Sequence, residues 1–143
     1  MLLPRLRLKR YVYHDGGRKE AGFNGHSGDC AIRAISIGTD LPYANVREAL
    51  ESMAYAQARQ SVDHGTPRVV YHPLLIMMGW TRVSTDKPTR LKDIPSGRVI
   101  CRLEKHLVAV IDKVPHDTHN AMRDRKYDIL SYYLPPADPY DMI

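Results

Sequence analysis

The residue best placed to do chemistry in this chain is Cys30, because of the sequence around it. A glycine-rich segment, 22–28, leads to Asp29 and Cys30, and apolar residues at helical spacing follow. Aspartate is a favoured helix N-cap, so Asp29 is expected to cap a helix whose first residue is Cys30. The unpaired N–H groups and the positive end of the helix dipole favour a thiolate there, as a cysteine nucleophile requires. The plainer alternative is that Cys30 is a small, buried apolar side chain.

A nucleophilic thiol needs a base, and the base needs a group that orients it. His106 opens an apolar strand, His-Leu-Val-Ala-Val-Ile, and a two-residue turn at 112–113 would join this strand to the next. That turn pairs Val108 with Asp117, and it pairs His106 with His119. Side chains alternate along a strand, so these four share one face and Asp117 is expected to orient the His106 ring. The simpler alternatives are a strand-end histidine satisfied by water or backbone and an aspartate in a turn.

Helical spacing comes before strand-like patterns along the chain, and this order predicts the elements that must position these residues. Helices are expected at 29–37, 42–59 and 66–79. Gly38 is expected to end the first helix, and Pro73 to kink or break the third. Strands are expected within 2–13 and at 80–84, 98–103, 106–111, 114–118 and 127–134. A helical turn is expected at 89–94 and a polar loop at 119–126. Helices followed by an antiparallel sheet predict an α+β fold.

The composition is that of one ordinary globular domain with an excess of basic residues. The 143 residues are 43% hydrophobic and carry a formal charge of +5, with a pI near 9.3. We expect a single domain over 1–134 and an extended or disordered tail over 135–143, which holds three prolines. Two cysteines do not indicate a disulfide framework, and neither a signal peptide nor a membrane span is recognised. A cytoplasmic location is therefore expected, and the basic excess admits an acidic partner.

Three short patches of the sequence resemble papain-like cysteine peptidases, above all the branch that processes bacteriocins at a double glycine. The patches are Asp29-Cys30, His106-Leu-Val-Ala-Val-Ile and His116-Asp117. The chain also resembles small phage and bacterial proteins that carry similar Gly-Asp-Cys and His-Leu-Val-Ala-Val-Ile patches. The resemblance implies a papain-like topology with Cys30 as nucleophile, His106 as general base and then acid, and Asp117 as orienting carboxylate. The family's oxyanion-hole glutamine falls on Asn24, which would act with the backbone N–H of Cys30.

The loop before the cysteine completes the expected site. Gly28, Asp29 and His26 are expected to contact the substrate, since they lie within four residues of Cys30. The implied reaction is thiol-dependent hydrolysis of a peptide or isopeptide bond, without cofactor or metal, in a bacterial or phage-infected cell. Deamidation or acyl transfer to an amine would use the same residues.

Three other functions stay open at the level of sequence. A zinc site would draw on His106, Asp117, His116 and His119, although residues three apart on a strand point to opposite faces. A non-catalytic protein-binding module, for example an inhibitor of a bacterial defence system, would use the same fold as a scaffold. Binding of single-stranded nucleic acid would use the basic amino end, where Arg10, Tyr11 and Tyr13 offer a mixture of aromatic and basic side chains that could stack on bases.

Overall fold

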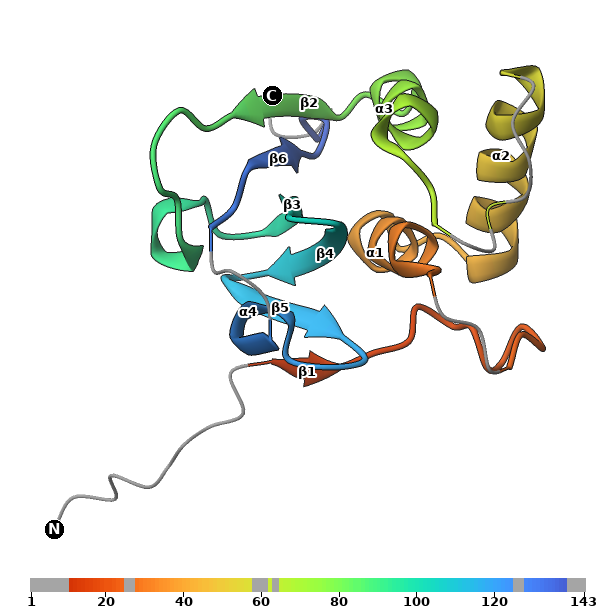
Figure 1. Cartoon of the computed structure of the whole chain (residues 1–143), viewed down its shortest axis with the longest axis horizontal. Coiled ribbons are helices and arrows are strands. Elements are labelled where there is room, and N and C mark those ends of the chain that lie inside the picture. Colours follow the sequence, from red (N-terminus) through yellow and green to blue (C-terminus); the bar gives the residue numbers. More distant parts are fainter. Residues whose placement is uncertain (1–10, 25–27, 58–61, 63–64, 125–127, 139–143) are drawn as a thin grey trace, which may run out of the picture.

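The computed structural model describes residues 11–24, 28–57, 62, 65–124 and 128–138, and it has an α+β fold (Figure 1). The helices are α1 (Cys30–Thr39), α2 (Tyr43–Ala56), α3 (Arg68–Met77), the 3-10 helix η2 (Leu91–Asp93) and α4 (Ala121–Asp124). The strands are β1 (Val12–Tyr13), β2 (Thr81–Ser84), β3 (Arg98–Leu103), β4 (His106–Ile111), β5 (Val114–Asp117) and β6 (Ser131–Leu134).

The described strands form one sheet in the order β1-β5-β4-β3-β6-β2. Neighbouring strands are antiparallel except for β1, which pairs in parallel with β5. The prediction of an antiparallel sheet was therefore wrong at this edge, where the short strand expected within 2–13 pairs in parallel. A parallel partner needs a long crossover connection, and the chain between β1 and β5 contains α1, α2 and α3.

The hairpin formed by β4 and β5 has the predicted register. Ile111 pairs with Val114 and Ala109 with His116, so the connection is the two-residue turn at Asp112 and Lys113. Both turn residues have positive φ, 50° and 66°, as a tight hairpin turn with the right-handed twist of its strands requires. The register places Asp117 beyond His116 at the end of β5, next to the start of β4.

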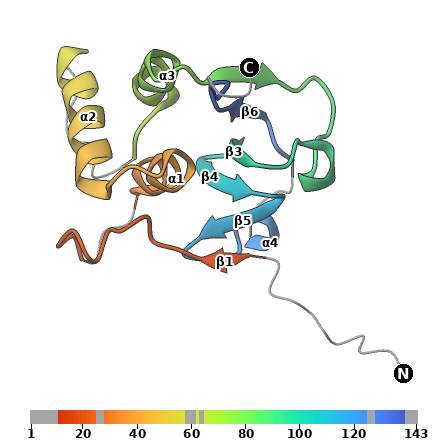
Figure 2. The same ribbon diagram turned by 180° about the vertical axis from the view of Figure 1, so that it is seen from behind.

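The sheet separates two apolar clusters. α1 and α3 lie on one face of the sheet, where α1 packs mainly against β4, and α2 packs against these two helices on their outer side (Figures 1 and 2). The first cluster lies between these helices and the sheet and includes Ile32, Leu50 and Ile100. The second lies on the opposite face and includes Val99, Cys101 and Met122, the last from α4. The cysteine helix is therefore held directly against the middle of the sheet.

Gly38 lies inside α1, whereas the sequence predicted that it would end the helix. A Cβ at this position would come within 2.6 Å of Ile100 Cγ1, so the absence of a side chain lets the helix approach β3 closely. The helix continues to Thr39, and Asp40 ends it in the left-handed conformation with φ 60°. Aspartate adopts this conformation more readily than most residues.

Pro73 lies within α3 without ending it. Proline has no N–H to donate to the carbonyl four residues earlier, which belongs to Val69. The side-chain amide of Gln57, just after α2, donates to that carbonyl at 2.8 Å instead. The bond between α2 and α3 thus satisfies the acceptor that the proline leaves unpaired.

The other predicted elements differ mainly at their ends. Strands β3 and β4 have the predicted bounds, and the predicted turn at 89–94 contains η2. The prediction of a loop over 119–126 was wrong at 121–124, where α4 forms and buries Ala121 and Met122 against the sheet. Strand β6 begins only at Ser131. The expected ends of the second helix at 58–59, most of the first strand and the tail from 139 lie outside the described residues.

Among the described helices, none is long and apolar enough to cross a membrane.

Candidate functional site

Cys30 is the first residue of α1 and is only half-buried. The side chain of His106 and the backbone N–H of Leu107 lie beside its thiol and favour the thiolate. Both partners come from the start of β4, the strand against which α1 packs. The structure therefore brings the predicted nucleophile and base together, although 75 residues separate them in the chain.

His106 is held from its other side by Asp117. The Nε2 atom of the histidine lies 2.6 Å from Oδ2 of Asp117, and both side chains are about 2% exposed. A histidine ring has two nitrogens, so this contact leaves Nδ1 for the sulfur of Cys30. The order sulfur, imidazole, carboxylate is the arrangement in which a carboxylate fixes the tautomer of a catalytic histidine.

Asp29 has a different task from the predicted one. It occupies the N-cap position, but its side chain makes no capping hydrogen bond. Its carboxylate is occupied by Arg33 Nε at 2.9 Å, by the Tyr43 hydroxyl at 2.9 Å and by Arg18 at 3.2 Å. The side chain is 1% exposed, so its carboxylate serves the packing of the helix start and is closed to a substrate.

Arg33 joins the carboxylate of Asp29 to the candidate triad of Cys30, His106 and Asp117. It lies one helical turn after Asp29, and its guanidinium group contacts Asp117 through Nη1 while Nε holds Asp29. The three buried side chains form a chain of alternating charges between the start of α1 and the end of β5. Burial opposes the charge on Arg33, but the two carboxylates outweigh it and raise the pKa of the guanidinium group.

The surroundings of the triad favour an ion pair between sulfur and imidazole. Burial opposes ionisation of the Cys30 thiol, but the hydrogen bond and charge of His106 outweigh it and lower the pKa. Burial also opposes the charged form of His106, while Asp117 and Cys30 together raise the pKa of the imidazole. Asp117 is desolvated as well, yet His106 and Arg33 bring the pKa of its carboxyl down to about 2. A thiolate and an imidazolium are thus favoured at the same pH.

A groove of about 450 Å³ opens beside the sulfur. Cys30 and His106 line it together with residues of α3, of the segment before it and of the end of β3. Asn24, the predicted oxyanion donor, is exposed and is not among the described residues that line the groove. Gly28 is exposed with φ 87°, a conformation that favours glycine. His26 lies outside the described residues.

His106, Asp117 and His119 also form a group whose ligand atoms lie within 4.8 Å of one another. The rings of the two histidines are 5.3 Å apart between centroids, as the predicted hairpin register requires. His116 is not a member of the group, and its Nδ1 contacts the carbonyl of Val114. A cation here would share Asp117 with the guanidinium group of Arg33, and the like charges would repel each other.

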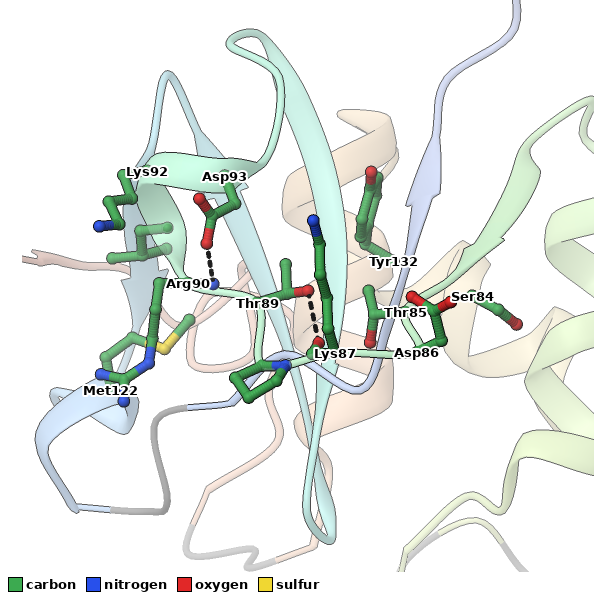
Figure 3. Close-up of a pocket in the computed structure, with 12 residues that line it drawn as sticks. Ser84, Thr85, Asp86, Lys87, Thr89, Arg90, Lys92, Asp93, Met122 and Tyr132 are labelled. Atoms are coloured by element: carbon green, nitrogen blue, oxygen red, sulfur yellow. Dashed lines mark hydrogen bonds between the residues drawn. The ribbon is translucent and has the colours of Figure 1, made fainter.

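A second, wider hollow of about 1040 Å³ lies over the apolar cluster on the opposite face of the sheet. Figure 3 shows that its labelled residues come from the end of β2, from η2 and from the segment that joins them, with Met122 and Tyr132 completing the wall. Its wall carries both basic and acidic side chains, Lys87, Arg90 and Lys92 together with Asp86 and Asp93. None of the three triad residues lines this hollow.

Sequence reasoning missed the residues that support and surround the triad. Arg33 has the ordinary appearance of a helix residue paired with Asp29 four positions earlier, and only that spacing gave a signal. Tyr43 gave none. The basic residues of the groove come from separate elements, so no local pattern joins them. These are Arg68, Arg102 and Lys105.

Comparisons of the chain with protein-family models, with curated proteins and with solved structures found no match.

Proposed function

We propose that this chain is a thiol-dependent hydrolase that cleaves a peptide or isopeptide bond, on a fold with papain-like topology. The observation that carries the proposal is the chain of contacts from Cys30 through His106 to Asp117. A half-buried cysteine at a helix N-terminus, with a lowered pKa and a groove beside it, is the environment of a reactive thiol. A cysteine-bearing helix packed on a sheet that carries the histidine supports the comparison with papain-like enzymes.

The reaction follows from the roles that these atoms can play. The thiolate of Cys30 attacks the carbonyl carbon, and the oxygen takes up the negative charge near the N-terminus of α1, where the backbone N–H of Cys30 is one donor. The imidazolium of His106 gives its Nδ1 proton to the leaving amine, and a thioester remains. Neutral His106 then takes a proton from water, whose oxygen attacks the thioester. Release of the acid restores the thiolate and the imidazolium, while Asp117 holds the ring throughout. Asn24 stays the predicted second donor to the oxyanion.

The decisive experiment is the pH dependence of Cys30 alkylation by iodoacetamide, read by mass spectrometry of the peptide that contains it. We expect an apparent pKa well below the roughly 8.5 of a free thiol. In His106→Ala the apparent pKa rises towards that of a free thiol, because the hydrogen bond and the positive charge are gone. The Cys101 peptide serves as an internal control in both proteins. An ordinary thiol pKa in the parent, unchanged by His106→Ala, would contradict the proposal.

A metal site is the second candidate, and the proximity of His106, Asp117 and His119 is the observation that favours it. Addition of Zn²⁺ would then raise the melting temperature, and His119→Ala would remove this effect while leaving the alkylation profile of Cys30 intact. Under the hydrolase proposal, Zn²⁺ gives no stabilisation that depends on His119, because the carboxylate it needs is already held by Arg33.

A further inference from the structure

The groove beside Cys30 has a strong charge asymmetry. Arg68 begins α3, Arg102 belongs to β3, and Lys105 lies in the turn between β3 and β4, yet all three line the same hollow as the sulfur. Among the described residues that line this groove there is no carboxylate. The wide hollow on the opposite face differs, since Asp86 and Asp93 lie among its basic residues.

These three cations are available to a ligand. No ion pair within the described part of the chain involves Arg68, Arg102 or Lys105, whereas Arg18, Arg33 and Arg47 each hold a carboxylate. Arg68 and Lys105 are exposed, and Arg102 is half-buried. Their positive charges are therefore not neutralised by protein carboxylates in the described region.

The cations also lie close to the rest of the groove wall. Burial raises the pKa of Tyr71 to about 12, although the charges of Arg102 and Arg68 act on the phenol in the opposite direction. Both guanidinium groups therefore lie near Tyr71, which lines the groove beside Cys30 and is influenced by its charge. A bound carboxylate would be within reach of the cations while its neighbouring carbonyl lay near the sulfur.

We infer that the groove selects an acidic substrate, one that presents a carboxylate within a residue or two of the bond that Cys30 attacks. This inference depends on the proposed hydrolase function, and it names the class of substrate that the same site would bind. The three uncompensated cations attract an anion before contact and hold it after contact, and salt weakens both effects. Arginine suits this role in particular, since its planar group pairs with a carboxylate through two hydrogen bonds.

Charged and neutral alkylating agents test the inference without a known substrate. We expect the ratio of the Cys30 alkylation rate with iodoacetate to that with iodoacetamide to exceed the ratio for free cysteine. Arg68→Gln and Lys105→Gln should each lower the ratio by about two- to fivefold, the effect of one partly solvated charge pair, and Arg102→Gln by at least as much. Lys87→Gln, an exposed cation at the other hollow, is the matched control and should leave the ratio unchanged. Added NaCl at 0.5 M should lower the ratio in the parent.

Protection by peptides then identifies the source of the carboxylate. Acetyl-Glu-Ala-Glu-Ala-amide should slow iodoacetamide labelling of Cys30 at a lower concentration than acetyl-Gln-Ala-Gln-Ala-amide. A third peptide, acetyl-Gln-Ala-Gln-Ala with a free C-terminal carboxylate, has its only carboxylate at the chain end. Protection by this peptide would indicate recognition of a chain end rather than of a glutamate side chain. The peptide that protects best in the parent should lose that advantage in Arg68→Gln.

The outcomes of this test are separate from those of the proposed function. A rate ratio equal to that of free cysteine, unchanged in the three groove variants, overturns the acidic-substrate inference even where the thiol pKa is low. An ordinary thiol pKa overturns the hydrolase proposal, but the rate ratio is still measurable at pH 9, where the thiol ionises in either case. Circular dichroism checks that each variant is folded. If Arg102→Gln does not fold, the variants at the exposed Arg68 and Lys105 still test the inference.

Discussion

The two cysteines of this chain show how far surroundings decide the chemistry of one side chain. Cys30 lies at the start of a helix, half-buried, with an imidazole, a backbone N–H and a guanidinium group nearby, and its pKa is lowered. Cys101 lies in the middle of β3, fully buried in the apolar cluster on the other face of the sheet, and burial raises its pKa well above the usual range. Burial raises the pKa of each thiol, and only Cys30 has polar partners that outweigh this effect.

This contrast separates two ways of controlling a thiol. Cys101 is inert because reagents and solvent do not reach it, so its protection depends on the stability of the fold. The pKa of Cys30 is lowered by a few neighbours, so the reactivity that we propose for it depends on their identity and position. The following substitutions change the surroundings of either Cys30 or Cys101, and they are given from the largest expected effect to the smallest.

The largest effect is expected from removal of each thiol in turn. Cys30→Ala should abolish rapid alkylation at pH 6 and all hydrolytic activity, since no other thiol is activated in the described structure. Cys101→Ala should leave both intact, because its side chain contacts only the apolar cluster. Mass spectrometry after a short exposure to iodoacetamide measures the first quantity. Rapid labelling that survived in Cys30→Ala would show that the activated thiol had been misassigned.

Arg33→Met should cause the largest loss of stability. The substitution leaves the buried carboxylates of Asp29 and Asp117 close to each other without their shared cation. Removal of one partner from a buried ion pair costs about 3–5 kcal/mol, and we expect a decrease of this size in the free energy of unfolding. Urea denaturation measures it. Arg47→Met, which removes an arginine paired with the half-exposed Glu51, is the matched control and should cost much less.

Asp117→Asn should change the protonation of the site while keeping its shape. Loss of the negative charge lowers the pKa of His106, so the imidazolium that stabilises the Cys30 thiolate is lost at a lower pH. We expect the apparent pKa of Cys30 alkylation to rise and the rate at pH 6 to fall about tenfold, the equivalent of one pKa unit. Hydrolysis should fall by more, because amide and carboxylate favour different tautomers of the histidine.

The same substitution should alter the dependence of stability on pH. The Asp117 carboxyl has a pKa of about 2 in the folded chain and an ordinary value near 3.9 when unfolded. Its contribution is therefore fully present above about pH 4 and is lost as the pH falls towards 2. In Asp117→Asn the urea midpoint should fall less steeply over this range. An unchanged slope would show that the carboxyl titrates normally in the folded state.

Gly38→Ala should have the smallest effect, and it should act on Cys101 rather than Cys30. The new methyl group would lie 2.6 Å from Ile100, the residue next to Cys101, and overpacking of this kind costs about 1–3 kcal/mol. We expect Cys101 to be labelled about tenfold faster under mild urea, where labelling follows opening of the fold. Labelling of Cys30 at neutral pH without urea should stay as it is. Equal acceleration of both thiols would contradict the distinction drawn here.

Local rules were sufficient to predict the hairpin that carries half of the site. Side-chain alternation and the length of one turn place Asp117 near His106, and the register of β4 and β5 follows that prediction. The position of Cys30 at a helix start also followed from local sequence. What brings this helix start to the start of β4 is the packing of α1 on the sheet, which no local pattern specifies.

The errors of prediction arose where a distant contact overrides a local preference. Glycine commonly ends a helix, but Gly38 is required by the approach of Ile100 from β3. Asp29 would cap its helix in isolation, but Arg33, Tyr43 and Arg18 take its carboxylate. The partner of Arg33 on the sheet lies 84 residues away, so sequence spacing could not reveal it.

The buried chain of charges from Asp29 through Arg33 to Asp117 has a consequence for the newly synthesised protein. It unites a segment before the first helix, that helix and the fifth strand, so it exists only after the carboxyl-terminal half has been made and has docked. Until then Cys30 lacks its imidazole and behaves as an ordinary, mostly protonated thiol. Under the proposed function, activation of the thiol therefore coincides with the completion of folding.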